Sequence, residues 1–266
     1  MLHSFGTGSD GSGPYAGLLD VQGALYGTTA AGGSGCTRGC GTVYRISTTG
    51  DEKVLHNFGG GSDGATPVAG FINVNGTLYG TTEYGGGSGC YGYGCGTVYS
   101  INTSGTERVL YRFDGRSDGS GPQVGLVSVN GTLYGTTENG GGSGCYGYGC
   151  GTVYSISTAG KEKVLHRFSG GSDGTQPLAG LIDANGELFG TTFAGGGSGC
   201  DGSGCGTVYR ISTTGKEKVL HSFGNGSDGA NPMAALTNRK GTLYGATEVG
   251  GSGCYSGCGT VFALAP

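Results

Sequence analysis

Ten cysteines arranged as five close pairs are the residues of this chain whose spacing most clearly permits chemistry. Three or four residues separate the two members of a pair, and none is left over, as is typical of disulfides formed in an oxidising compartment. Zinc and redox centres are alternatives, but two cysteines fall short of the four ligands of a structural zinc site, and the spacing is not C-x-x-C. We therefore predict the disulfides Cys36–Cys40, Cys90–Cys95, Cys145–Cys150, Cys200–Cys205 and Cys254–Cys258.

One aspartate recurs in a Ser-Asp-Gly motif, at positions Asp10, Asp63, Asp118, Asp173 and Asp228. Such a carboxylate could bind Ca²⁺ or accept a hydrogen bond from a sugar hydroxyl. The alternative is a turn in which the aspartate accepts hydrogen bonds from its own backbone. The sequence favours the turn, because Ca²⁺ needs several oxygen ligands and only one carboxylate recurs in each loop.

Tyrosines lie in three of the cysteine loops, at Tyr91, Tyr93, Tyr146, Tyr148 and Tyr255. They stand among glycines without apolar neighbours, so we expect them to be exposed. Exposed rings can stack on sugars or on partner proteins; the alternative is that each ring lies flat over its own loop. These tyrosines and the five aspartates form our predicted ligand-binding set.

Histidine recurs once per repeat at His3, His56, His166 and His221, and Tyr111 takes the remaining place. A catalytic base is rarely repeated in this way, so we interpret these residues as packing and hydrogen-bonding groups. No nucleophile, base and acid stand out together. We predict no catalytic residue, no cofactor and no metal.

The elements that must position these residues come from one repeated unit. The sequence Gly-Thr-Leu-Tyr-Gly-Thr-Thr, or a close variant, begins at Gly23, Gly76, Gly131, Gly186 and Gly241, mostly 55 residues apart. A period of this size indicates a solenoid, a propeller or an array. We predict one domain over residues 1–266, with repeats at about 2–54, 55–109, 110–164, 165–219 and 220–266.

Within the fourth repeat, four short strands are predicted at Leu178–Ile182, Glu187–Thr192, Thr207–Ser212 and Glu217–Phe223. The strands are apolar on both faces, unlike a sheet with one wet face. Four antiparallel strands covered on both sides are the content of a propeller blade. The fold class is therefore all-β, a five-bladed β-propeller; an open array or a prism-like arrangement is the alternative.

The two ends of the chain each fall inside a repeat. Leu2–Phe5 matches the fourth strand, and the last repeat stops after a third strand ending at Leu264. We predict that the N-terminal segment completes the last blade, in a 3+1 closure. Because Met1 lies directly on a repeat, we expect a mature domain or a segment of a longer protein.

The run G-T-L-Y-G-T-T, then G-x-G-T-V-Y-x-I, then V-L-H-x-F resembles the GloVer (Gloeo/Verruco) tandem repeat, with small departures such as Tyr111 and Ala246. The resemblance covers essentially the whole chain. It implies a secreted or surface-anchored bacterial protein, and it carries no established enzymatic activity and no assigned ligand.

Net charge and hydropathy limit the classes of molecule that the protein could bind. The net charge is −4, only 12% of residues are charged, and no basic stripe is present, so nucleic acid is excluded as a partner. No apolar run approaches the roughly 20 residues of a membrane span. We predict an extracellular or cell-surface, non-enzymatic propeller that binds a glycan or surface polymer through the face bearing the long loops. The alternative is a structural, adhesion or filament-forming subunit that contacts copies of itself; an enzyme with a central site is a third possibility.

Overall fold

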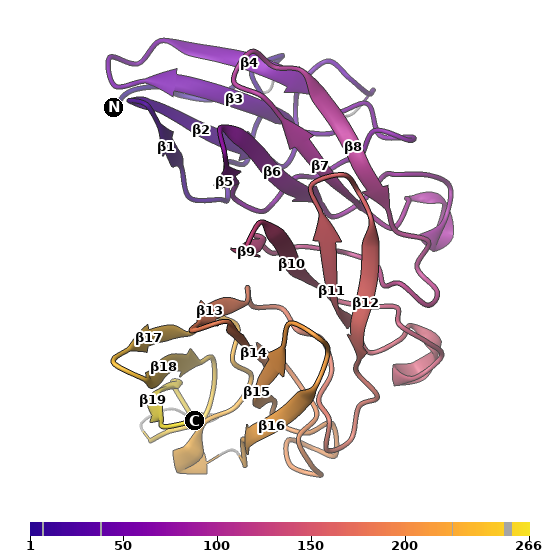
Figure 1. The fold of residues 1–266 in the computed structure, drawn as a ribbon, viewed down its shortest axis with the longest axis vertical. Helices are drawn as coiled ribbons and strands as arrows, with labels where there is room; N and C mark the ends of the chain where they lie inside the picture. Colours follow the sequence, from indigo (N-terminus) through magenta and orange to yellow (C-terminus); the bar gives the residue numbers. More distant parts are fainter. Residues whose placement is uncertain (7, 38, 225, 253–256) are drawn as a thin grey trace. The chain divides into compact units, whose positions relative to one another are not determined.

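The structure is a computed structural model that describes residues 1–266 except 7, 38, 225 and 253–256. Its strands form five antiparallel sheets in the described part of the chain (Figure 1). The first sheet contains β1 (Leu19–Val21), β2 (Ala24–Thr29), β3 (Thr42–Ser47) and β4 (Glu52–Asn57). The second contains β5 (Ile72–Val74), β6 (Thr77–Thr82), β7 (Thr97–Ile101) and β8 (Glu107–Arg112). The third contains β9 (Val127–Val129), β10 (Thr132–Thr137), β11 (Thr152–Ser157) and β12 (Glu162–Arg167).

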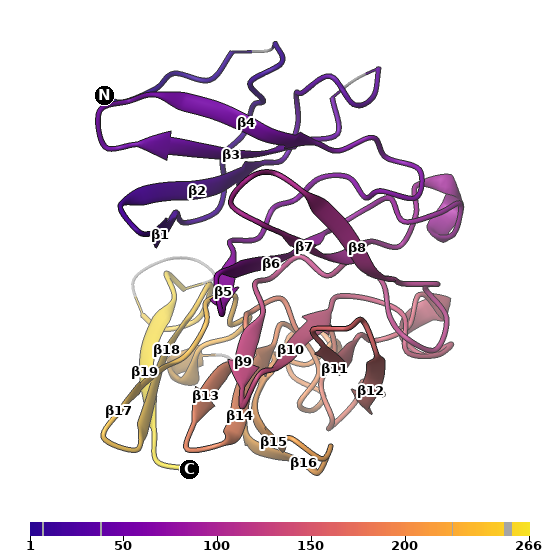
Figure 2. The same ribbon diagram turned by 45° about the horizontal axis from the view of Figure 1, so that its top comes forward.

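The fourth sheet contains β13 (Ile182–Ala184), β14 (Glu187–Thr192), β15 (Thr207–Ser212) and β16 (Glu217–Ser222). The fifth contains β17 (Thr237–Arg239), β18 (Thr242–Thr247) and β19 (Thr260–Leu264), which lie side by side in both views (Figure 2). Short 3₁₀ turns cover Cys90–Gly92, Cys145–Gly147 and Gly226–Asp228. None of the helices within the described ranges is long and apolar enough to cross a membrane.

Each sheet is a simple meander, so the prediction of an all-β fold with blade-like units is confirmed. The predicted closure is not shown. In the described residues the fifth sheet has three strands, and Leu2–Phe5 are assigned to no strand.

The second, third and fourth strands of a repeat lie close to their predicted positions, because local signals determine them. Asn185 and Gly186 both have positive φ, at 59° and 81°, as a tight hairpin turn between β13 and β14 requires. The first strand was predicted wrongly: it was expected at Leu178–Ile182 and is found at Ile182–Ala184. Its small residues contact the neighbouring repeat instead of strand two, since a Cβ on Gly70 would lie 3.3 Å from the Gly17 carbonyl oxygen.

The chain divides into two compact units, and the division passes through the third repeat. The first comprises residues 1–115, 120–131 and 156–162; the second comprises 116–119, 132–155 and 163–266. In the first unit, apolar side chains of the first and second sheets share one buried cluster, in which the rings of Phe58 and Tyr99 meet edge to face at 5.1 Å. In the second unit, the fourth and fifth sheets do the same, with Phe223 against Phe262 at 5.1 Å.

A pair of threonines, buried in the first four repeats and partly buried in the fifth, joins strand two to strand three. The two hydroxyl oxygens are 2.8–2.9 Å apart in the pairs Thr29–Thr42, Thr82–Thr97, Thr137–Thr152, Thr192–Thr207 and Thr247–Thr260.

The hydroxyl of Thr82 also connects the strands to the long loops. It donates to the Tyr84 carbonyl oxygen at 2.8 Å and accepts from the backbone N–H of Thr97 at 3.1 Å. A Cβ on Gly64, the glycine of a Ser-Asp-Gly motif, would lie 2.7 Å from this hydroxyl oxygen. The motif therefore needs glycine because its backbone lies directly against the threonine pair.

Replacing Thr82 with valine should lower the free energy of unfolding by about 2–4 kcal/mol, because buried partners lose their hydrogen bonds while the shape is kept. Thr82→Ser retains the hydroxyl and should cost less than half as much. Thr77→Val, at the half-buried start of the same strand, is the control for valine itself. Urea denaturation measures all three, and equal costs for Thr82→Val and Thr82→Ser would contradict this role.

Candidate functional site

Four of the five predicted disulfides are present: Cys36–Cys40, Cys90–Cys95, Cys145–Cys150 and Cys200–Cys205. Cys254 of the fifth predicted pair and Tyr255 lie outside the described residues. Each bond closes a loop of about five or six residues, which in the loop-entropy treatment contributes about 2 kcal/mol. The bonds pin glycine-rich loops that would otherwise be ordered only at a large cost in conformational entropy.

The third of these loops holds a tyrosine in a demanding backbone conformation. Cys145 and Tyr146 both have left-handed φ, at 51° and 61°, within the 3₁₀ turn Cys145–Gly147. This conformation costs free energy in residues other than glycine. The Tyr146 side chain is nevertheless 98% exposed. The ring therefore gains little packing in return for the strained backbone.

The four described loop tyrosines are all exposed, as predicted: Tyr91, Tyr93, Tyr146 and Tyr148. Tyr93 lies near Tyr84, with ring centroids 6.3 Å apart. At the position of Tyr84 the third repeat has Asn139, so the surroundings of Tyr148 are more polar.

A pocket of about 500 Å³ opens beside the Cys145–Cys150 disulfide, within the second compact unit. Two of the predicted binding residues, Tyr146 and Tyr148, line it. Polar groups complete the wall: Asn139, Ser169, Thr175, Gln176 and Ser203. Exposed rings next to amide and hydroxyl groups suit a ligand that presents both C–H faces and hydroxyls.

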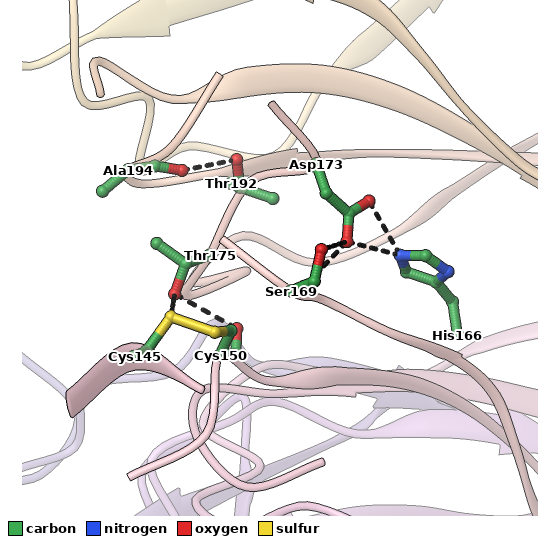
Figure 3. Close-up of a disulfide and its surroundings, with 8 residues drawn as sticks. All are labelled: Cys145, Cys150, His166, Ser169, Asp173, Thr175, Thr192 and Ala194. Carbon is green, nitrogen blue, oxygen red and sulfur yellow. Dashed lines mark hydrogen bonds and ion pairs between the residues drawn. A yellow bond between two sulfur atoms is a disulfide. The ribbon is translucent and has the colours of Figure 1, made fainter. Parts of the chain in front are cut away.

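Hydrogen bonds hold the base of this pocket in place. The Thr175 hydroxyl lies 3.2 Å from the Cys145 sulfur and donates to the Cys150 carbonyl oxygen at 3.3 Å (Figure 3). Backbone bonds between Thr175 and Ala194, 2.9 and 3.2 Å long, join the Ser-Asp-Gly loop to the next cysteine loop. Both long loops of a repeat thus contribute to one wall.

The Ser-Asp-Gly aspartates bond within their own loops rather than pointing into the pocket. Asp173 accepts from the backbone N–H and the hydroxyl of Ser169, at 2.7 and 3.0 Å (Figure 3). Three others accept from the backbone N–H four residues earlier: Asp10, Asp63 and Asp228. Asp118 is buried, with 7% of its surface exposed. The turn interpretation is the one that these contacts favour.

Each of these aspartates except Asp118 also bonds to the histidine seven residues earlier. The histidine Nε2 lies 3.0–3.3 Å from a carboxylate oxygen in the pairs His3–Asp10, His56–Asp63, His166–Asp173 and His221–Asp228. The histidine rings also meet a phenylalanine two residues later, at 4.7–4.9 Å. The predicted packing and hydrogen-bonding role of the histidines is therefore confirmed.

A glutamate from the following sheet, which the sequence reasoning missed, joins two of these pairs. Glu107 lies with His56 and Asp63, and Glu217 lies with His166 and Asp173. Burial, followed by the charge of Asp63, raises the pKa of Glu107 to about 7. Burial also raises the pKa of Asp63, but hydrogen bonds from His56 and from the Gly59 N–H outweigh it and leave that pKa below its usual value. The recurring spacing of His, Asp and Glu could have revealed the grouping.

The backbone strain at Tyr146 can be measured by comparing its substitution with glycine and with alanine. Glycine tolerates positive φ and alanine does not, so Tyr146→Gly should be more stable than Tyr146→Ala by about 1 kcal/mol. In an unstrained exposed position alanine is the more stable of the two. Urea denaturation of both variants decides it, and an alanine variant at least as stable as the glycine variant would exclude strain at this residue.

Comparison with known proteins identifies the repeat. The Gloeobacter/Verrucomicrobia repeat matches residues 1–149 and 143–266, and no curated protein matches the chain. Three solved structures illustrate how distant the structural likenesses are. PorZ, a bacterial surface component of the type-IX secretion system of Porphyromonas gingivalis, aligns at 13% identity and TM-score 0.56, over 96% of this chain and 32% of its own. A gluconolactonase from Xanthomonas campestris aligns at 14% identity and TM-score 0.51, over 86% of this chain and 67% of the gluconolactonase. Tricorn protease aligns at 13% identity and TM-score 0.43. The alignment covers 84% of this chain but only 20% of tricorn protease.

The structural likenesses, all at low identity, bear on the fold alone. The repeat matches are different in kind, because together they cover every residue from 1 to 266. This chain therefore belongs to the Gloeobacter/Verrucomicrobia repeat family.

Proposed function

We propose that the protein is an extracellular, non-enzymatic binding propeller that recognises carbohydrate at the pocket beside the third disulfide. The observation that carries the proposal is the exposed, left-handed Tyr146 at the rim of that pocket. An aromatic ring offers a stacking surface for the C–H face of a sugar, and Asn139, Gln176 and Ser203 offer hydrogen bonds to its hydroxyls. Of the distant structural relatives, PorZ is a bacterial surface component, the location proposed here.

The rigidity of the pocket supports a binding role. A disulfide and a bridge of backbone hydrogen bonds fix the loops before any ligand arrives. Preorganised loops lose less conformational entropy on binding, so a small polar ligand can be held by few contacts. The four disulfides fit an oxidising, extracellular compartment.

We also propose that the five sheets close into one ring, with Leu2–Phe5 as the fourth strand of the fifth sheet. Leu2–Phe5 already lie against the first sheet as a fourth strand lies against the following sheet. A Cβ on Gly50 would lie 2.6 Å from the Leu2 carbonyl oxygen, and the same relation joins Gly105 to Leu55 at 2.8 Å. Likewise, the Phe5 and Tyr44 rings meet at 4.8 Å, as Phe58 and Tyr99 do at 5.1 Å.

Among the residues that the structure describes, the fifth sheet has three strands and the other four sheets have four. Val261 on β19 is 83% exposed, whereas its counterparts Val43 and Val208 are fully buried. A strand supplied from the N-terminus would pair with β19 and give the fifth sheet the composition of the other four.

Carbohydrate binding should depend on the third repeat more than on the second. A glycan array identifies a ligand, and titration calorimetry then measures its affinity for Tyr148→Ala and for the matched variant Tyr93→Ala. Losing a stacking ring costs about 1.4 kcal/mol, or roughly tenfold in affinity, so Tyr148→Ala should bind about tenfold more weakly and Tyr93→Ala within twofold of the parent. No glycan binding, together with assembly into fibres or large oligomers, would instead support a structural subunit.

Ring closure makes a separate prediction for hydrogen exchange. Alternate backbone amides within Leu2–Phe5 should exchange as slowly as the corresponding amides of β16, because both segments would be paired fourth strands. Exchange of the whole N-terminal segment at the rate of an unstructured peptide, while β16 stays protected, would exclude closure by this segment.

A further inference from the structure

Two trios of side chains bring together a histidine on one sheet, the aspartate of the loop that follows, and a glutamate on the next sheet. The first is His56, Asp63 and Glu107, which lies in the first compact unit, and the second is His166, Asp173 and Glu217, which lies in the second. Within each trio one potential ligand atom per residue lies within 4.8 Å of the others. The two trios arise from the same repeat positions, so the arrangement is built by the repeat.

One carboxylate oxygen of the glutamate in each trio accepts no hydrogen bond from the described residues. Glu107 Oε1 and Glu217 Oε1 are inaccessible to solvent, and neither has a hydrogen-bond partner in the described part of the chain. An inaccessible carboxylate oxygen without a donor is costly, so it calls for a positively charged or donating partner; the corresponding oxygen of Glu52, outside the two trios, is in the same state.

A fully buried tyrosine lies within electrostatic range of the carboxylates of each trio. The side chains of Tyr99 and Tyr209 are fully buried, and their hydroxyls also lack a hydrogen-bond partner among the described residues. The charges of Glu107 and Asp63 both act on Tyr99, and that of Glu217 acts on Tyr209. Each trio thus combines one imidazole with two carboxylates, and the charge of Arg112 also acts on Glu107 and Asp63 in the first trio.

We propose that each trio is a binding site for one divalent transition-metal ion, with Zn²⁺ as the occupant. One imidazole nitrogen with two carboxylate oxygens is a donor set that Zn²⁺ accepts, whereas Ca²⁺ requires six to eight oxygens. The ion sits between the histidine of one sheet, the aspartate of the loop that follows it, and the glutamate of the next sheet. It therefore joins successive sheets within a unit, and its binding stabilises the fold. This revises the expectation that the chain holds no metal, and it does not depend on the proposed carbohydrate function.

Metal binding is tested on the full-length, untagged protein with its disulfides intact, since a histidine tag would itself bind Zn²⁺. After treatment with a chelator and its removal, the protein is titrated with Zn²⁺ by calorimetry. We expect two ions per chain, dissociation constants in the micromolar range or below, and a Tm that rises with Zn²⁺ but not with equimolar Ca²⁺.

The variants replace histidine with tyrosine, the residue that one repeat already has at this position. Tyr111 occupies the histidine position of the third repeat, so His56→Tyr and His166→Tyr should be accommodated by the packing. Each should lower the stoichiometry from two to one, and the double variant to zero. Glu162→Gln, at the corresponding glutamate of the repeat that carries Tyr111, should still bind two ions.

Near-UV circular dichroism establishes that each variant is folded. If a tyrosine variant fails to fold, Glu107→Gln and Glu217→Gln, which keep the side-chain shape, take its place with the same expected stoichiometry. The proposal is overturned if the folded parent shows no saturable Zn²⁺ binding, or if it binds Zn²⁺ with a stoichiometry that neither the histidine nor the glutamate variants change.

Discussion

The hydrogen bond between two buried threonines is the interaction on which each repeat depends. Thr82 and Thr97 illustrate it: one hydroxyl pair joins strands two and three where both strands meet the long loops. Because every donor and acceptor there is buried, the loop backbones must approach closely enough to complete the set. That closeness explains Gly64, whose missing Cβ leaves room for the Thr82 side chain. The threonine pair therefore fixes where the long loops begin and how near to each other they lie.

Loops anchored in this way can vary in sequence without disturbing the sheets. The disulfide adds a second anchor farther out, so a loop such as Cys145–Cys150 is held at its base and across its middle. What remains unconstrained is the side chain at the turn, which is tyrosine in two described loops and aspartate at Asp201 in a third. The left-handed backbone is the same in all three, so the fold dictates the conformation and leaves the residue type open. Variation at a strained, exposed position is what a recognition surface on a rigid scaffold requires.

The sequence predicted the features that depend on neighbours along the chain. Strands two to four of the first four sheets, the Asn-Gly turns and the four described disulfides all follow from patterns within about fifteen residues, and they were placed correctly. Strand one was misplaced because its position is decided by another repeat: Gly70 packs against the Gly17 carbonyl, a contact that the apolar run around it does not reveal. The trio of His56, Asp63 and Glu107 was missed for a related reason, since Glu107 lies far along the chain from the other two, on the following sheet. Whether a loop wall becomes a pocket is likewise decided by side chains from two loops at once.

Two kinds of polar site thus follow from one repeat, and they differ in what the repeat allows to change. The pocket residues lie on loops, and several of them, such as Tyr148 and Ser203, are exposed, so replacing one of these should have little effect on folding. The trios lie between sheets. There, leaving the buried polar atoms of Glu107 and Tyr99 without hydrogen-bond partners costs free energy. Where Tyr111 takes the place of histidine, the repeat loses an imidazole and gains a larger ring, with a ring contact to Phe113 at 5.1 Å in place of the histidine–phenylalanine contact of the other repeats. Packing at this position is therefore satisfied by either residue, and the recurrence of histidine must be explained by its chemistry.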